Sequence, residues 1–324
     1  MADVGFADEY PLPVVDSRNF HSADPDSIRR EYCFFLKSVQ SIVFRTLVDA
    51  MKEIVADTNV VFDERGVLVK AMDEPQNALI HLRLHAEELE EYICDGTHVC
   101  GVALLHLHRI LKTMSSTDVL MLYMRRSNQN VLEIRIENSK KAKTSHYSLY
   151  LLDLKKTNIR VRSPEFRQAI SIDSTEFHKI IREMKDISGS IDIQCHRNTL
   201  RFKSVKGAFA DADIHLGIRA SGEATPADGA VMSARSNATA TAETVGGLVS
   251  GRGGTGGPEE EEGLYPEIVQ GVFSLKYLSQ FVKCTSLSKK VHIFLKNDYP
   301  LIVQYGVSNL GTIRLVLVYD EPDV

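Results

Sequence analysis

The chain contains one group of residue types that could ligate a metal ion: Cys94, His98, Cys100, His106 and His108. Structural zinc sites use thiolate and imidazole ligands, but they space them in recurring patterns such as two cysteines separated by two to four residues. Here a Cys-x3-His-x-Cys run is followed by His-x-His, which matches none of the usual patterns. The sequence therefore predicts no metal site.

Two further patterns resemble nucleotide or acid-base chemistry. Residues 251–256 (GRGGTG) satisfy the glycine spacing of a dinucleotide-binding motif. This motif binds a dinucleotide only where a strand directly precedes it and a helix directly follows it. Here Pro258 and four glutamates follow, so a loop is favoured. The carboxylate pairs at 87–88 and 90–91 fit a solvated turn better than a dry acid-base site, and no catalytic triad is apparent. We therefore expect neither catalytic residues nor a cofactor, and no enzyme.

Composition bounds the class of protein. The 324 residues are 44% hydrophobic and 25% charged, which is typical of a globular chain long enough for two domains. The formal net charge of -5 is unfavourable for nucleic acid when taken over the whole molecule. Five scattered cysteines, no signal peptide and no apolar run of bilayer length favour a reducing interior and no membrane partner.

One structural unit is repeated four times along the chain: a short amphipathic helix, a turn, and then alternating strands. The helical windows are 41–52, 104–113, 174–185 and 274–283. Strand segments such as 131–136 alternate apolar and polar residues, and the short polar turns between strands require antiparallel pairing. The sequence therefore predicts an α+β fold of two similar domains, each built from two such units, with helices covering one face of each sheet.

Two segments depart from this unit. The first has several prolines and no period, which indicates a flexible leader, and the second is built of Ala, Gly, Ser and Thr with almost nothing to bury. The predicted organisation is a leader (1–31), a first domain (32–151), a connector (152–168) and a second domain (169–324) interrupted by a low-complexity insert (219–263).

The four helical windows carry basic residues on the side opposite their apolar residues. Arg45 and Lys52 are seven residues apart, two turns along one face, and so are Lys276 and Lys283. The formal charges of the four windows sum to +6, which leaves -11 for the rest of the chain. Positive and negative charge are therefore segregated along the chain, although the net charge is only -5. A continuous surface of this kind suits a phosphate backbone without reading bases. Besides Lys185, the windows contain eight basic residues: Arg45, Lys52, Arg109, Lys112, Lys179, Arg182, Lys276 and Lys283.

Scattered residue matches identify a family. They run in order from about residue 32 to 319 and include Leu47-x-x-Ala50-x-Lys52-x-Ile54, Met72-Asp73, Tyr92-x-Cys94-Asp95, Ile110-Leu111-Lys112, Ser174-x-x-Phe177-x-x-Ile180-x-Arg182 and Leu275-x-Tyr277-Leu278-x-x-Phe281-x-Lys283. The chain resembles the proliferating cell nuclear antigen family of DNA sliding clamps. This resemblance implies a head-to-tail homotrimeric ring that encircles double-stranded DNA without sequence preference and raises polymerase processivity. It places the eight basic residues in the central channel, where Thr46 stands in place of a lysine usual in the family.

The same resemblance implies a pocket beneath the connector that takes short motifs from client proteins. The partners it implies are DNA polymerase, the clamp loader, and ligases or nucleases of replication and repair. The connector here is basic where the family's is often acidic, which favours clients with more acidic flanks. The residues that match pocket positions are Met72, Leu79, Ile159, Val161, Pro300 and Leu317.

The resemblance also implies which strands join the subunits. An edge strand of one copy would pair with an edge strand of the next, so that a sheet continues across the boundary. The matching residues are Ser145, Tyr147, Leu149 and Leu151 on one side and Asp213 and His215 on the other.

Two other functions stay open from the sequence. The chain could be one subunit of a heterotrimeric checkpoint-type clamp, which shares the fold, or a structural interaction hub with no role on DNA. Its location would be the nucleus, or a cytoplasmic viral replication compartment if the leader and insert mark a virus-encoded clamp.

Overall fold

The computed structural model describes residues 25–155, 169–196, 199–217 and 269–319. The insert predicted at 219–263, most of the leader, and the pocket candidates Ile159 and Val161 lie outside these described residues.

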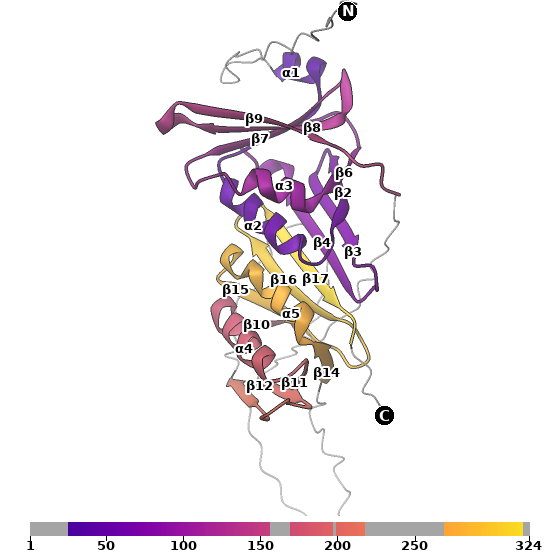
Figure 1. Cartoon of the computed structure of the whole chain (residues 1–324), viewed down its shortest axis with the longest axis vertical. Helices are drawn as coiled ribbons and strands as arrows, with labels where there is room; N and C mark the ends of the chain where they lie inside the picture. The colour runs from indigo at the N-terminus through magenta and orange to yellow at the C-terminus, as the bar shows by residue number, and fades with distance from the viewer. Residues whose placement is uncertain (1–24, 156–168, 197–198, 218–268, 320–324) are drawn as a thin grey trace, which may run out of the picture.

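Three antiparallel sheets make up the described fold, and they follow one another along the long axis of the molecule (Figure 1). In order across the first sheet, the strands are β5 (Glu91–Cys94), β1 (Tyr32–Ser38), β7 (Val119–Arg125), β8 (Asn128–Asn138) and β9 (Lys143–Tyr150). Across the third sheet they are β13 (Asp213–Gly217), β12 (Thr199–Val205), β11 (Ser190–His196) and β14 (Val269–Ser274).

The second sheet lies between these two and joins the two halves of the chain. In order, its strands are β10 (Ile170–Asp173), β15 (Lys290–Phe294), β16 (Leu301–Val307), β17 (Gly311–Leu317), β4 (Ala78–His85), β3 (Gly66–Met72), β2 (Asp57–Asp63) and β6 (His98–Ala103). The junction is the antiparallel pair of β17 with β4, in which Arg314 lies opposite His81. Because backbone hydrogen bonds cross this junction, the two domains share one rigid central layer.

The helices lie on one side of the sheets, as predicted. Figure 1 shows α3, α2, α5 and α4 in a column along the long axis, on the near side of the strands. Their bounds are α2 (Ser41–Met51), α3 (Leu104–Leu111), α4 (Ser174–Ile187) and α5 (Leu275–Phe281), with α5 continued by the 3-10 turn η4 (Val282–Leu287). The remaining short 3-10 turns are η2 (Ala86–Glu88) and η3 (Ser139–Lys141).

Local sequence explains where these helices begin and why they dock. At the start of α4, the Asp173 carboxylate accepts backbone hydrogen bonds from Thr175 and Glu176 at 2.9 and 3.2 Å, which satisfies N–H groups that have no partner within the helix. The apolar face of each helix then enters a single core cluster, to which α4 and α5 contribute the fully buried Phe177 and Phe281. The α+β prediction with helices on one face is confirmed.

The beginning of the described chain differs from the leader predicted for residues 1–31. Residues Pro25–Glu31 form a helix, α1, that packs against β1. Ile28 is 2% exposed and lies in a second apolar cluster with Phe35 and Tyr123. A helix of seven residues is too short for its helical period to be read from sequence, so composition alone assigned this segment to the leader.

Candidate nucleic-acid interface

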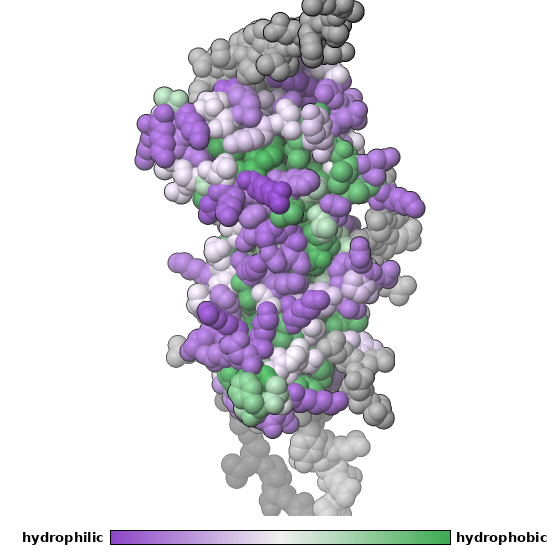
Figure 2. Space-filling view, viewed as in Figure 1, coloured by the Kyte–Doolittle hydropathy of each residue, from purple (hydrophilic) through white to green (hydrophobic). Residues whose placement is uncertain are grey.

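The column of helices presents the predicted basic residues on its open side. Figure 2, in the same view, shows hydrophilic side chains gathered over these helices. Five of the eight cations have exposed side chains, and within the described chain none of them has a carboxylate oxygen within 4.0 Å. These five are Arg109, Lys112, Lys179, Arg182 and Lys276. They come from α3, α4 and α5, so both domains supply exposed positive charge, although α2 contributes none of the five.

The other three cations are engaged within the chain. The Lys52 ammonium lies 3.0 Å from Asp49 and 2.5 Å from Glu53, and the Lys283 ammonium lies 3.0 Å from the same oxygen of Glu53. Arg45 donates a hydrogen bond of 3.0 Å to the backbone carbonyl of Met114. Glu53 therefore links the end of α2 to η4 across the two domains and holds two of the predicted DNA-contacting lysines.

Electrostatics keeps this linkage ionised. Hydrogen bonds from Lys52 and then Lys283 lower the pKa of Glu53, although partial burial opposes the shift. The hydrogen bond to Glu53 raises the pKa of Lys52. Glu53 and Lys52 are thus both charged at neutral pH. The helical windows missed this because Glu53 follows directly after the first one, and its partner Lys283 lies 230 positions away in sequence.

The two strands predicted to join subunits are both edge strands. β9 ends the first sheet and β13 ends the third, at opposite ends of the described molecule. Along β9, Ser145 and Tyr147 are half-buried and Leu149 is buried, and Leu151 follows the strand. In β13 the side chains of Asp213 and His215 are exposed, and Asp213 pairs with Arg201.

Exposed aromatic residues mark both of these edges. Tyr150 at the end of β9 is 78% exposed, and Phe209, shortly before β13, is 77% exposed. Large apolar side chains at such exposure are typical of surfaces that another chain covers. Neither residue was among the predicted interface positions, although Tyr150 lies between two that were.

An apolar row crosses the second sheet on the side away from the helices. Met72, Leu79, Val316 and Ile302 lie opposite one another in successive strands from β3 to β16. Met72 is 37% exposed, whereas Leu79 and Ile302 are buried without belonging to either core cluster. The predicted pocket residues Met72 and Leu79 are therefore brought together, and Val316 and Ile302 extend their row.

Leu317 does not join this row. Its side chain is 1% exposed and lies in the main core, because successive strand residues point to opposite faces and Val316 takes the outward position. Pro300, which directly precedes β16, is half-buried. Alternation along β17 would have identified Val316 from sequence.

Hydrogen bonds fix the loop at the end of this row. The buried Asp73 carboxylate accepts the backbone N–H of Ala78 at 2.7 Å and the Tyr277 hydroxyl of α5 at 2.5 Å. The second bond ties the β3–β4 turn, in the first domain, to a helix of the second. The connector begins at the β6 edge of the same sheet, where the Leu152 N–H donates to the Gly101 carbonyl at 2.8 Å. A Cβ at residue 101 would lie 2.1 Å from the Leu152 carbonyl oxygen, so glycine permits this approach.

The cysteines and histidines of the zinc-like run serve separate local roles. Cys94 donates to the Gly96 carbonyl at 3.2 Å, His98 lies 2.7 Å from the Asp95 carboxylate, and Cys100 is fully buried. Within the ranges that the structure describes, no group of three or more His, Cys, Asp or Glu residues is placed to hold a metal ion. In the same ranges, no helix is long and apolar enough to span a membrane.

Comparison with known proteins identifies the family of this fold. The family model for the N-terminal domain of proliferating cell nuclear antigen matches residues 34–158, and that for its C-terminal domain matches 160–241 and 262–319. The chain is 26% identical over 284 residues to a protein named "Probable DNA polymerase sliding clamp 1" from Paramecium bursaria Chlorella virus 1, covering 88% of this chain and 95% of the relative. It is 27% identical over 281 residues to proliferating cell nuclear antigen of Chaetomium thermophilum, covering 86% and 94%. The chain therefore belongs to the proliferating cell nuclear antigen family of sliding clamps, as a divergent member.

Proposed function

We propose that three copies of this chain close into a ring around double-stranded DNA and act as a processivity factor for DNA polymerase. The observation that carries this proposal is the placement of cationic helices from both domains on one face of a chain whose two ends are edge strands. Pairing of β9 with β13 of the next copy would continue the sheets, and it would turn the column of helices toward a common centre.

In this ring the contacts between the cationic side chains and the DNA phosphates can be individually weak. A closed ring is held on DNA by its topology, so the cations only need to exchange between phosphates as the ring moves. Five exposed cations per subunit supply such contacts, and Lys52 and Lys283 are held back by Glu53. Long flexible side chains that touch phosphates carry no sequence information, so the ring would slide on any duplex.

The apolar row on the outer side of the second sheet is the proposed docking site for clients. Met72 and Leu79 lie there together with Val316. A short peptide with a helical turn and aromatic side chains can bury its apolar face in such a row. DNA polymerase, clamp loader, and ligase or nuclease clients would compete for this surface, at sites of replication in a nucleus or a viral compartment.

Two measurements test the ring. Sedimentation of the purified chain should give about 109 kDa, three times the 36.2 kDa chain, whereas a stable monomer would favour a heterotrimeric checkpoint-type clamp. Reversal of Lys112, Lys179 and Arg182 to Glu should abolish stimulation of polymerase processivity without changing this mass. Arg30→Glu changes an exposed cation on α1, which packs against the first sheet, so it is the matched control and should leave processivity unchanged. Undiminished processivity in the triple variant would refute the DNA-tracking role.

A further inference from the structure

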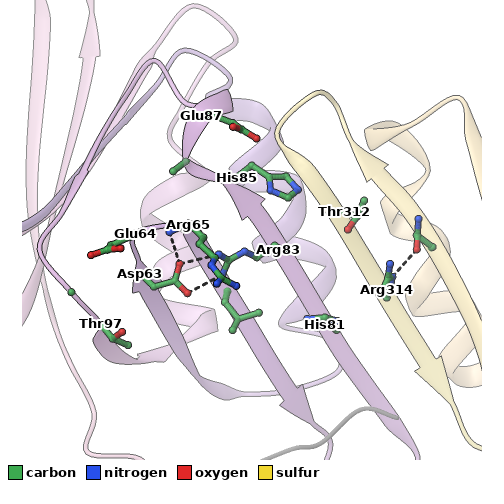
Figure 3. A pocket seen from close by; sticks show the side chains of 14 residues that line it. Asp63, Glu64, Arg65, His81, Arg83, His85, Glu87, Thr97, Thr312 and Arg314 are labelled. Carbon is green, nitrogen blue, oxygen red and sulfur yellow. Dashed lines mark hydrogen bonds and ion pairs between the residues drawn. The ribbon is translucent and has the colours of Figure 1, made fainter. Parts of the chain in front are cut away.

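A groove of about 1150 Å³ lies on the outer face of the second sheet (Figure 3). It adjoins the apolar row, because His81 in the groove and Leu79 in the row are same-face neighbours along β4. Its floor is formed by β3, β4, β17 and β16, so it spans both domains. The lining is polar and includes His81, Arg83, Arg314 and Gln304. None of these positions was singled out from sequence.

The end of the groove next to the apolar row is cationic. Lys70, His81, Arg314 and Gln304 lie opposite one another in successive strands, one same-face position from the row that contains Met72. Same-face neighbours along a strand are about 7 Å apart. This cationic band contains no acidic residue, and Lys70 is exposed at its open end.

The carboxylates that line the groove lie elsewhere. Asp63 receives two hydrogen bonds from Arg83, at 2.9 and 3.0 Å, so its charge is already matched. Glu64 and Glu87 lie beyond the Gly66 end of β3, away from His81 and Arg314 in Figure 3. The groove is therefore divided: acidic and basic side chains are mixed near Glu64, Arg65 and Glu87, whereas the end that adjoins the apolar row has basic side chains without carboxylates.

Arg314 is the residue in this band that most lacks a counter-charge. Its Nε donates to the Gln304 side-chain oxygen at 2.7 Å, and no carboxylate of the described chain lies within 4.0 Å of its guanidinium group. Burial lowers the pKa of Arg314, although it remains charged at neutral pH. Burial, together with Lys70 and Arg314, lowers the pKa of His81 to about 4, so His81 is neutral and leaves acceptor and donor atoms for a ligand. A half-buried guanidinium that keeps free donors is suited to a planar carboxylate.

We propose that this groove binds the acidic flank of a client peptide whose apolar anchor occupies the Met72 row, with Arg314 and Lys70 contacting its Asp or Glu side chains. The inference rests on the client-docking part of the proposed function. It identifies the partner chemistry as an extended segment with carboxylates within a few residues of the anchor. Charge complementarity and the continuity of groove and row select this occupant.

Two fluorescent peptides test the proposal by anisotropy. Both carry a central helical anchor with two aromatic residues, flanked on each side by four Glu in one peptide and four Gln in the other. The Glu peptide should bind wild type about tenfold more tightly than the Gln peptide, and Arg314→Gln should remove most of this advantage. Lys70→Gln changes an exposed side chain, so it tests the same band without risk to folding. Lys203→Gln on the third sheet is the control and should preserve the advantage.

The outcomes separate the inference from the function on which it rests. Binding of both peptides with equal affinity would refute the groove while leaving client docking in place, and binding of neither would refute both. A third result concerns the chain's own end, since residues 320–324 include Asp320, Glu321 and Asp323. If deletion of these residues strengthens binding of the Glu peptide tenfold in wild type but not in Arg314→Gln, the chain's own terminus fills the groove and the proposal is overturned.

Discussion

Glu53→Gln is expected to raise the affinity of the ring for double-stranded DNA. In the structure one Glu53 oxygen holds Lys52 at 2.5 Å and Lys283 at 3.0 Å. The neutral amide would release the Lys283 ammonium group and leave Lys52 paired with Asp49 alone, so each of the three subunits gains at least one available cation on the helix face. Because the three groups are between 16% and 39% exposed, the lost ion pairs should cost less than about 1 kcal/mol of unfolding free energy.

The magnitude follows from counterion release. Each phosphate neutralised adds about -0.9 to the slope of log K against log salt concentration. If one duplex in the ring gains two contacts, the slope steepens by about 2, and the loss of affinity between about 50 and about 200 mM salt grows by roughly tenfold. The assay is fluorescence anisotropy of a short linear duplex over this salt range.

A matched variant distinguishes release of lysines from a general change of charge. Glu183→Gln removes the same charge from exposed α4, and among the described residues Glu183 forms no ion pair. It should steepen the slope much less than Glu53→Gln. Identical slopes for the two variants would refute the idea that Glu53 withholds lysines from DNA.

Three further predictions concern the subunit boundary, the central sheet and α1. Phe209→Glu should raise the trimer dissociation constant at least tenfold in sedimentation equilibrium, because burial of a phenylalanine contributes about 1.5–3 kcal/mol. The stability of the monomer should stay unchanged, since the side chain is 77% exposed in the single chain. An unchanged dissociation constant would exclude Phe209 from the subunit interface. Burial and nearby cations lower the pKa of His81 to about 4. Between that value and the unfolded pKa of about 6.5 the unfolded chain binds a proton that the folded chain does not, so the free energy of unfolding decreases as the pH is lowered. Between about pH 7 and pH 5, His81→Gln should therefore lose about 1 kcal/mol less than wild type in urea unfolding, after allowance for solvent screening, and parallel losses would contradict the shift. Ile28→Ala should cost α1 about 2–4 kcal/mol of docking energy and expose residues 25–31 to hydrogen exchange, whereas unchanged protection would mean that α1 is not held by Ile28.

Sequence patterns were informative where burial is periodic. The four helices were predicted within a few residues because alternate apolar and basic faces repeat along each window, and all four enter the core with the expected face. Strand alternation also predicted the antiparallel hairpins. Both signals come from the chain's own local geometry, which needs no knowledge of distant contacts.

The contacts that could not be predicted from the sequence depend on pairing between segments that are distant along the chain. The contact of Glu53 with Lys283 and the band from Lys70 to Arg314 both arise from the junction of the two domains, which no local pattern encodes. Leu317 was assigned by resemblance alone, and strand alternation places Val316 outward instead. The helix α1 gives too short a signal because it buries a single isoleucine.

The central claim, that the chain encircles DNA, is tested most directly by blocking the ends of a linear duplex. At concentrations that favour the trimer, a ring can thread onto a linear duplex through a free end, and it is held by topology once both ends are closed. We predict retention on a biotinylated duplex whose ends are closed with streptavidin after the protein is added, and no retention when streptavidin closes both ends before the protein is added. Equal retention for the two orders of addition at the same salt concentration would contradict encirclement and show binding to the outside of the DNA.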